Sequence, residues 1–155
     1  MNRYEVPEVL QLLEKYELSI AALYETFGTV LSESKNAWMA FAHEERLHAK
    51  WINTLNKYVK DGKIAFEKTK ITTQSIKTAI DYIENQKNRT LREKPDLKHC
   101  LNIAINVEKA LLENAFFRVF KLDVPETQKI RTRLEEATKA HMEKLIEWRE
   151  QVIKS

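Results

Sequence analysis

The strongest constraint on the fold is a helical period that runs through almost the whole chain. Apolar residues recur at alternating three- and four-residue steps, a spacing that places them on one face of an α-helix. The pattern predicts four long amphipathic helices and one shorter helix. We expect the long helices at 6–32, 36–61, 96–122 and 124–153, and the shorter one at 74–89.

The supply of turn residues supports the same fold class. The chain has only two glycines and three prolines among 155 residues. An all-β fold needs many more tight turns, and a glycine-rich phosphate loop has almost no residues from which to form. The length is typical of one domain, so we expect residues 1–155 to form a single all-α unit.

The lengths of the connections predict how the helices are arranged. Short polar links join the first long helix to the second and the third to the fourth, so each pair should be antiparallel. The link between the second and third long helices is about 35 residues long, with an extended part at 63–73 and the short helix at 74–89. These connections predict a four-helix bundle with one long crossover.

Composition argues against several functions. Lys plus Arg is 26 and Asp plus Glu is 23, a net charge of +3 that is too small to indicate nucleic-acid binding. No apolar run approaches the ~18 residues of a membrane span, and glutamates interrupt the N-terminal segment where a signal peptide is apolar. The single cysteine, Cys100, should be an inert buried thiol. We therefore expect a cytoplasmic protein that contacts neither nucleic acid nor membrane.

The apolar face of each long helix, here called its seam, is interrupted near its middle by polar residues. Burial of an unpaired carboxylate is costly, so such residues are partnered, neutralised or bound to a metal. Their similar heights along the four helices predict that they meet in one layer, where carboxylates and imidazoles suit a metal site. The candidate ligands are Glu17, Glu45, His48, Glu108 and His141.

Simpler interpretations remain open at this stage. The carboxylates could pair with a buried Lys or Arg, or turn to solvent, and His141 could be a core histidine with a local partner. Thr138, one turn before His141, fits a packing residue that bonds to its own helix. Tyr24 fits the core better than a role as a partner of the site. His43 and His99 should lie outside the layer.

These motifs resemble those of the ferritin-like, rubrerythrin-type di-iron proteins along nearly the whole chain. The resemblance is carried by residues 17–24 (ELSIAALY), 41–49 (FAHEERLHA), 105–113 (INVEKALLE) and 135–141 (EEATKAH). It implies a ferritin-like bundle, one or two iron ions at the five candidate ligands, and peroxide reduction or ferrous-iron oxidation. Manganese or zinc are the alternative metals. A homodimer and an external electron donor are also implied, and the exposed aromatics Trp38 and Trp51 are candidates for the dimer interface.

The chain departs from the family pattern in two places. The fourth helix of the family usually carries Glu-x-x-His, whereas this chain has Thr138 before His141. A second glutamate on the third long helix would fall at Leu111 or Leu112. The loss of anionic ligands weakens the second metal position most. The alternative is a degenerate bundle that holds a structural metal, or none, and acts through protein association.

Overall fold

The computed structural model describes residues 6–60, 64–66, 73–113, 120–122 and 125–155, and helices account for nearly all of them. The all-α prediction is confirmed for these residues. None of the described helices combines the length and the apolar character that crossing a membrane requires. The elements are α1 (Val6–Val30), the 3₁₀ turn η1 (Ser32–Ser34), α2 (Lys35–Lys60), β1 (Ile64–Phe66), α3 (Thr73–Glu93), α4 (Leu97–Glu113), β2 (Phe120–Leu122) and α5 (Pro125–Lys154).

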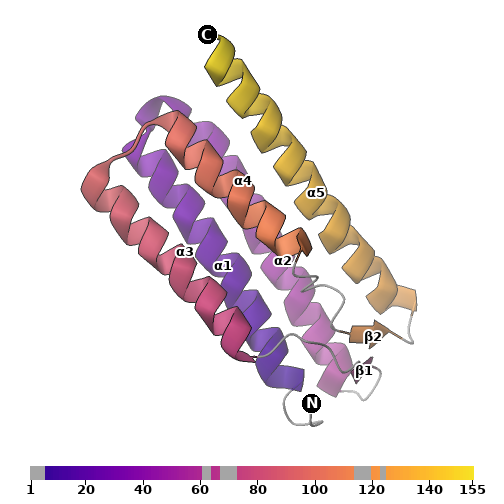
Figure 1. Cartoon of the computed structure of the whole chain (residues 1–155). Helices are drawn as coiled ribbons and strands as arrows, with labels where there is room; N and C mark the ends of the chain where they lie inside the picture. The colour runs from indigo at the N-terminus through magenta and orange to yellow at the C-terminus, as the bar shows by residue number, and fades with distance from the viewer. Residues whose placement is uncertain (1–5, 61–63, 67–72, 114–119, 123–124) are drawn as a thin grey trace.

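The helices lie side by side along one long axis (Figure 1). α1 packs against α2 and α3, and α5 packs against α4 and α2. β1 pairs antiparallel with β2, with Ile64 opposite Leu122. Because β1 follows α2 and β2 follows α4, the C-terminal ends of α2 and α4 lie at the same end of the molecule, and the two helices run in the same direction (Figure 1).

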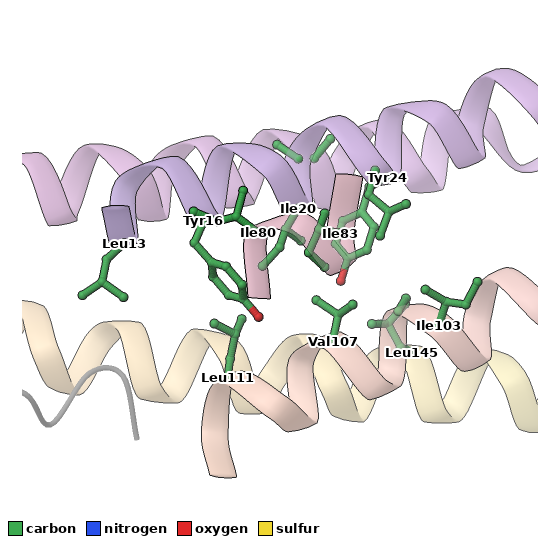
Figure 2. Close-up of a cluster of buried hydrophobic side chains, with 14 of the residues drawn as sticks. Leu13, Tyr16, Ile20, Tyr24, Ile80, Ile83, Ile103, Val107, Leu111 and Leu145 are labelled. Atoms are coloured by element: carbon green, nitrogen blue, oxygen red, sulfur yellow. The ribbon is translucent and has the colours of Figure 1, made fainter. Parts of the chain in front are cut away.

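The core forms where α1 faces the other helices. Figure 2 shows side chains of α1 and α3 directed toward those of α4 and α5, with Tyr16, Ile20 and Tyr24 opposite Val107 and Leu111. Each of these five is at most 3% exposed. Full burial of one such aliphatic side chain contributes about 1.5–3 kcal/mol to stability. This packing holds α1 against α4 at the height where the polar residues interrupt the seams.

Trp38 contradicts the expectation of an exposed aromatic at an interface. Its side chain is fully buried, and its ring packs against Phe27 at a centroid distance of 4.9 Å. Gly28 permits this close approach of α1 and α2, since a Cβ atom there would lie 3.3 Å from Cβ of Trp38. Trp51 is partly buried and packs against the core.

Most helix boundaries differ from the prediction by one or two residues, but α3 ends four residues later than expected. α3 continues to Glu93 rather than ending at residue 89. The first residue that disfavours the helix is Pro95, and its ring restricts the backbone conformation only of the residue before it, Lys94. Lys94 there has φ 46°, and its N–H donates to the carbonyl oxygen of Thr90. α4 begins as expected: the backbone N–H of His99 donates to Oδ1 of Asp96 at 2.9 Å, which is an N-cap.

The prediction of one helix over 96–122 is wrong at its end. α4 ends at Glu113, residues 114–119 lie outside the described residues, and Phe120–Leu122 form β2. The partner of this strand is about 55 residues earlier in the chain. A local apolar period carries no information about such a distant backbone partner, and that partner decides whether an apolar triplet forms a strand.

Candidate metal centre

The structure brings all five candidate ligands into one buried layer. Glu17 comes from α1, Glu45 and His48 from α2, Glu108 from α4 and His141 from α5. None of the five is more than 2% exposed. The spacing Glu45-x-x-His48 places both side chains on the same face of α2, and that face is turned toward the other three helices. Four separate helices thus contribute to a single cluster.

His48 lies between two carboxylates. Its Nδ1 is 3.3 Å from Oε2 of Glu45 and 3.7 Å from Oε2 of Glu17. The ring of Trp51 covers the imidazole, with centroids 5.2 Å apart. On this side of the cluster, one nitrogen and two carboxylate oxygens from α1 and α2 converge.

His141 has a matching position on the other side. Its Nδ1 lies 2.9 Å from Oε1 of Glu45 and 3.5 Å from Oε1 of Glu108. The two imidazole rings stack at a centroid distance of 5.1 Å. Glu45 therefore contacts both histidines, each through a different oxygen. Glu45, His48 and His141 offer one ligand atom each, and these atoms all lie within 4.8 Å of one another.

The buried charges shift the pKa values of the cluster. Burial lowers the pKa of His48, but contacts with Glu17 and Glu45 outweigh burial and raise that pKa to about 10. The pKa of His141 rises to about 11 because contacts with Glu108 and Glu45 likewise outweigh burial. Burial, and then the charge of Glu45, hold the pKa of Glu17 well above its usual range. The metal-free cluster therefore retains protons at neutral pH.

The cluster leaves polar atoms unsatisfied in a way that fits a cation. Within the described part of the chain, five buried atoms of its side chains have no hydrogen-bond partner: Oε1 and Oε2 of Glu17, Oε2 of Glu45, Nδ1 of His48 and Oε2 of Glu108. Three of them meet one another as ion pairs without a hydrogen bond, since Nδ1 of His48 lies near Oε2 of Glu45 and of Glu17. Buried polar groups are nearly always hydrogen-bonded, so this concentration requires an explanation. All five are atoms that can ligate a metal ion. Mixed carboxylate and imidazole ligands suit iron, manganese or zinc.

Two contacts of the cluster were not predicted as such. The hydroxyl of Tyr24 donates to Oε1 of Glu108 at 2.7 Å, so Tyr24 is a partner of the site as well as a core residue. Its position seven residues after Glu17, about two helical turns along the same face, was the sequence feature that could have indicated this contact. Nε2 of His141 contacts Oε2 of Glu44, whose side chain is 41% exposed. No seam pattern marks Glu44, because it lies at the edge of the buried face.

The simpler interpretations are now distinguished for several residues. Thr138 is buried, and its hydroxyl donates to the carbonyl oxygen of Leu134 at 2.8 Å, as expected for a packing residue. His43 and His99 are exposed and lie outside the cluster. Cys100 is fully buried, and burial raises the pKa of its thiol to about 12. In the described residues, the ion pairs of Glu17, Glu45 and Glu108 are with histidine.

The described geometry is therefore a buried cluster of three carboxylates and two imidazoles between four helices, with one further carboxylate at its edge. Comparison of the chain with protein-family profiles, with curated proteins and with solved structures finds no match.

Proposed function

We propose that this chain is a ferritin-like protein of the rubrerythrin type that binds iron at the buried cluster. The observation that carries the proposal is the convergence of Glu17, Glu45, His48, Glu108 and His141 with unsatisfied ligand atoms. The common direction of α2 and α4, joined by a long connection, agrees with a ferritin-like arrangement. The chemistry proposed for the site is peroxide reduction or ferrous-iron oxidation.

In this proposal the five side chains hold one or two ions. Glu45 contacts both histidines, so its carboxylate would help to hold an ion on either side of the cluster. Bound iron supplies one-electron redox chemistry, which no side chain of the cluster supplies by itself. The surrounding apolar core excludes water, Tyr24 orients Glu108 through its hydrogen bond, and Glu44 orients His141 through Nε2. The two positions differ, since Thr138 adds no carboxylate on the side of His141.

The proposal extends to the setting of the protein. We propose a cytoplasmic homodimer that receives electrons from an external donor. The donor is required because repeated reduction of peroxide consumes electrons that a carboxylate and histidine site does not hold.

Metal analysis tests the proposal directly. Protein is produced in medium supplied with iron, then with manganese, then with zinc, and the bound metal per chain is measured after gel filtration. Wild-type protein should retain one or two ions, with iron preferred. Glu45→Gln should lose the metal, whereas Glu143→Gln, at an exposed position on α5, should retain it. Retention of metal by Glu45→Gln at the wild-type level would contradict the proposal.

A second candidate is supported by Thr138. Its hydroxyl is used within its own helix, so the side of His141 has one carboxylate fewer than the family pattern. In this alternative the bundle has lost its redox chemistry and acts through protein association. The alternative is favoured if wild-type protein binds no metal under any of the three supplies and still forms concentration-dependent complexes in sedimentation.

A further inference from the structure

A continuous line of redox-capable rings leads away from the buried cluster. It begins at Tyr24, whose hydroxyl donates to Oε1 of Glu108 at 2.7 Å. The ring of Tyr24 lies 5.6 Å from that of Trp38, and Trp38 lies 5.0 Å from Trp148, measured between centroids. The three side chains come from α1, α2 and α5, so the line crosses the bundle rather than following one helix.

The outer end of this line reaches the surface. Tyr24 and Trp38 are fully buried, whereas Trp148 is partly exposed. Trp148 lines an open groove of about 670 Å³ at the turn between α1 and α2, together with Leu31, Ser32 and Leu97. A molecule in this groove can therefore contact Trp148. Trp148 is two ring-to-ring steps from Tyr24, the hydrogen-bond partner of Glu108.

The hydrogen bonds give the inner two rings different redox properties. Phenol and indole side chains can lose one electron, and the oxidised phenol is stabilised when a base takes its proton. Tyr24 has such a base in Glu108. In the described part of the structure, Nε1 of Trp38 has no hydrogen-bond partner, so its oxidised ring has no acceptor for its proton. Trp38 is therefore suited to brief oxidation during electron transfer, and the oxidised state is more stable on Tyr24.

We infer that Tyr24, Trp38 and Trp148 form a relay that carries single electrons from a one-electron reductant in the groove to the buried cluster. This inference rests on the proposed function, because an oxidised metal ion is the acceptor. Tyr24 gives one electron to that ion and its phenolic proton to Glu108. Trp38 then reduces Tyr24, which recovers the proton from Glu108, Trp148 reduces Trp38, and the reductant restores Trp148.

The competing explanation is that the three rings are only core packing. Aromatic clusters are common in cores, and these rings also contact Phe27 and Phe41. Packing alone predicts that Phe can replace each ring without any electronic effect. The relay predicts a specific loss, since Phe is not oxidised in the same range as Trp or Tyr. A test must therefore read out electron movement and must not depend on bound metal.

Metal-free protein provides that test. A ruthenium polypyridyl photo-oxidant is attached in the groove through Ser32→Cys, and buried Cys100 should not react with the label. A laser flash with an irreversible electron acceptor generates ruthenium(III), which takes one electron from Trp148. The charge should then move through Trp38 to Tyr24, where the proton passes to Glu108. Electron paramagnetic resonance should detect a tyrosyl radical, and Tyr24→Phe should abolish it.

The variants separate the relay from packing. Trp38→Phe and Trp148→Phe, each in the labelled protein, should both abolish the Tyr24 radical while circular dichroism shows an unchanged helical fold. Trp51→Phe removes a tryptophan outside the line and should leave the radical yield unchanged. If Trp38→Phe fails to fold, Trp148→Phe at its partly exposed position decides the question. An undiminished radical in a folded Trp148→Phe or Trp38→Phe protein overturns the relay, as does a labelled wild type that forms none. Because no metal is present, these outcomes are independent of whether the chain binds iron.

Discussion

Oε1 of Glu45, on α2, lies 2.9 Å from Nδ1 of His141, on α5. The other oxygen of the same carboxylate lies 3.3 Å from Nδ1 of His48, one turn along α2. One buried carboxylate thus connects two imidazoles whose pKa values are raised to about 10 and about 11. Each imidazole must release its proton before its Nδ1 can bind a metal ion, and the pH behaviour of the site follows from this requirement.

Metal binding should release protons. The raised pKa values keep both histidines protonated at pH 7 in the metal-free protein, so binding of one ion between them should release roughly two protons, and a further one where the ion also displaces the proton of Glu17. The apparent affinity should then rise at least roughly 100-fold per pH unit near neutrality. Titration with zinc, which is redox-inert, in weakly buffered solution measures the released protons. A release of less than one proton per ion would contradict binding at His48 and His141.

The stability of the metal-free protein should fall as the pH rises. The folded-state pKa values of both histidines lie above the unfolded value of about 6.5, so their contribution is complete below that pH and is lost as the pH approaches 10. Glu17, whose pKa is raised well above its usual range, acts in the same direction. The slope should be on the order of 1.4 kcal/mol per pH unit for each proton. Chelated protein melted between pH 5 and pH 9 measures it, and a flat or rising profile would refute it.

Glu17→Gln should separate metal affinity from stability. A carboxyl group with a strongly raised pKa is readily protonated when metal is absent, and Gln has a similar shape, so the stability of the chelated protein should change by less than about 1 kcal/mol. Metal affinity should fall tenfold or more because one ligand is lost. Denaturant unfolding and zinc titration give the two quantities. Glu14→Gln, on the same helix and outside the cluster, is the control. A stability loss with unchanged affinity would indicate a structural role for Glu17.

Glu44→Gln should weaken metal binding from outside the cluster. Glu44 contacts Nε2 of His141, which directs Nδ1 toward Glu45 and Glu108. Replacement of a carboxylate that orients a ligating histidine typically lowers metal affinity 10- to 100-fold. The ring nitrogens of His141, observed by ¹⁵N NMR, should show a changed tautomer population in the variant. Unchanged affinity and an unchanged NMR pattern would show that Glu44 does not position the ring.

Thr138→Glu should restore a carboxylate on the side of His141. Thr138 is 1% exposed and one turn before His141 on α5, so the new side chain would enter the cluster. Metal content per chain should rise toward two ions. The metal-free variant should be less stable than wild type by at least about 2 kcal/mol, because one more carboxylate is buried among like groups. Metal analysis and chelated melts measure both effects. Thr132→Glu, at an exposed position on α5, should produce neither.

The five candidate ligands could be identified from the sequence because helical periodicity is a local property. A carboxylate in the place of an apolar residue, as at Glu17 or Glu108, marks a buried polar position whatever the rest of the chain does. The spacing of Glu45 and His48 places both side chains on one helix face through backbone geometry alone. The N-cap of α4 is also local, since Asp96 accepts a hydrogen bond from the N–H of His99, three residues later.

Tertiary packing decided what depends on distant partners. The predicted end of α4 was wrong because β2 pairs with β1, about 55 residues earlier in the chain. No local apolar period encodes that pairing. Trp38 is buried rather than exposed because Gly28 lets α1 approach α2 closely. The contacts of Tyr24 with Glu108 and of Glu44 with His141 join residues of different helices that are 84 and 97 positions apart in the sequence. Such contacts depend on how helices rotate and slide against one another, which is set by the shapes of all packed side chains together.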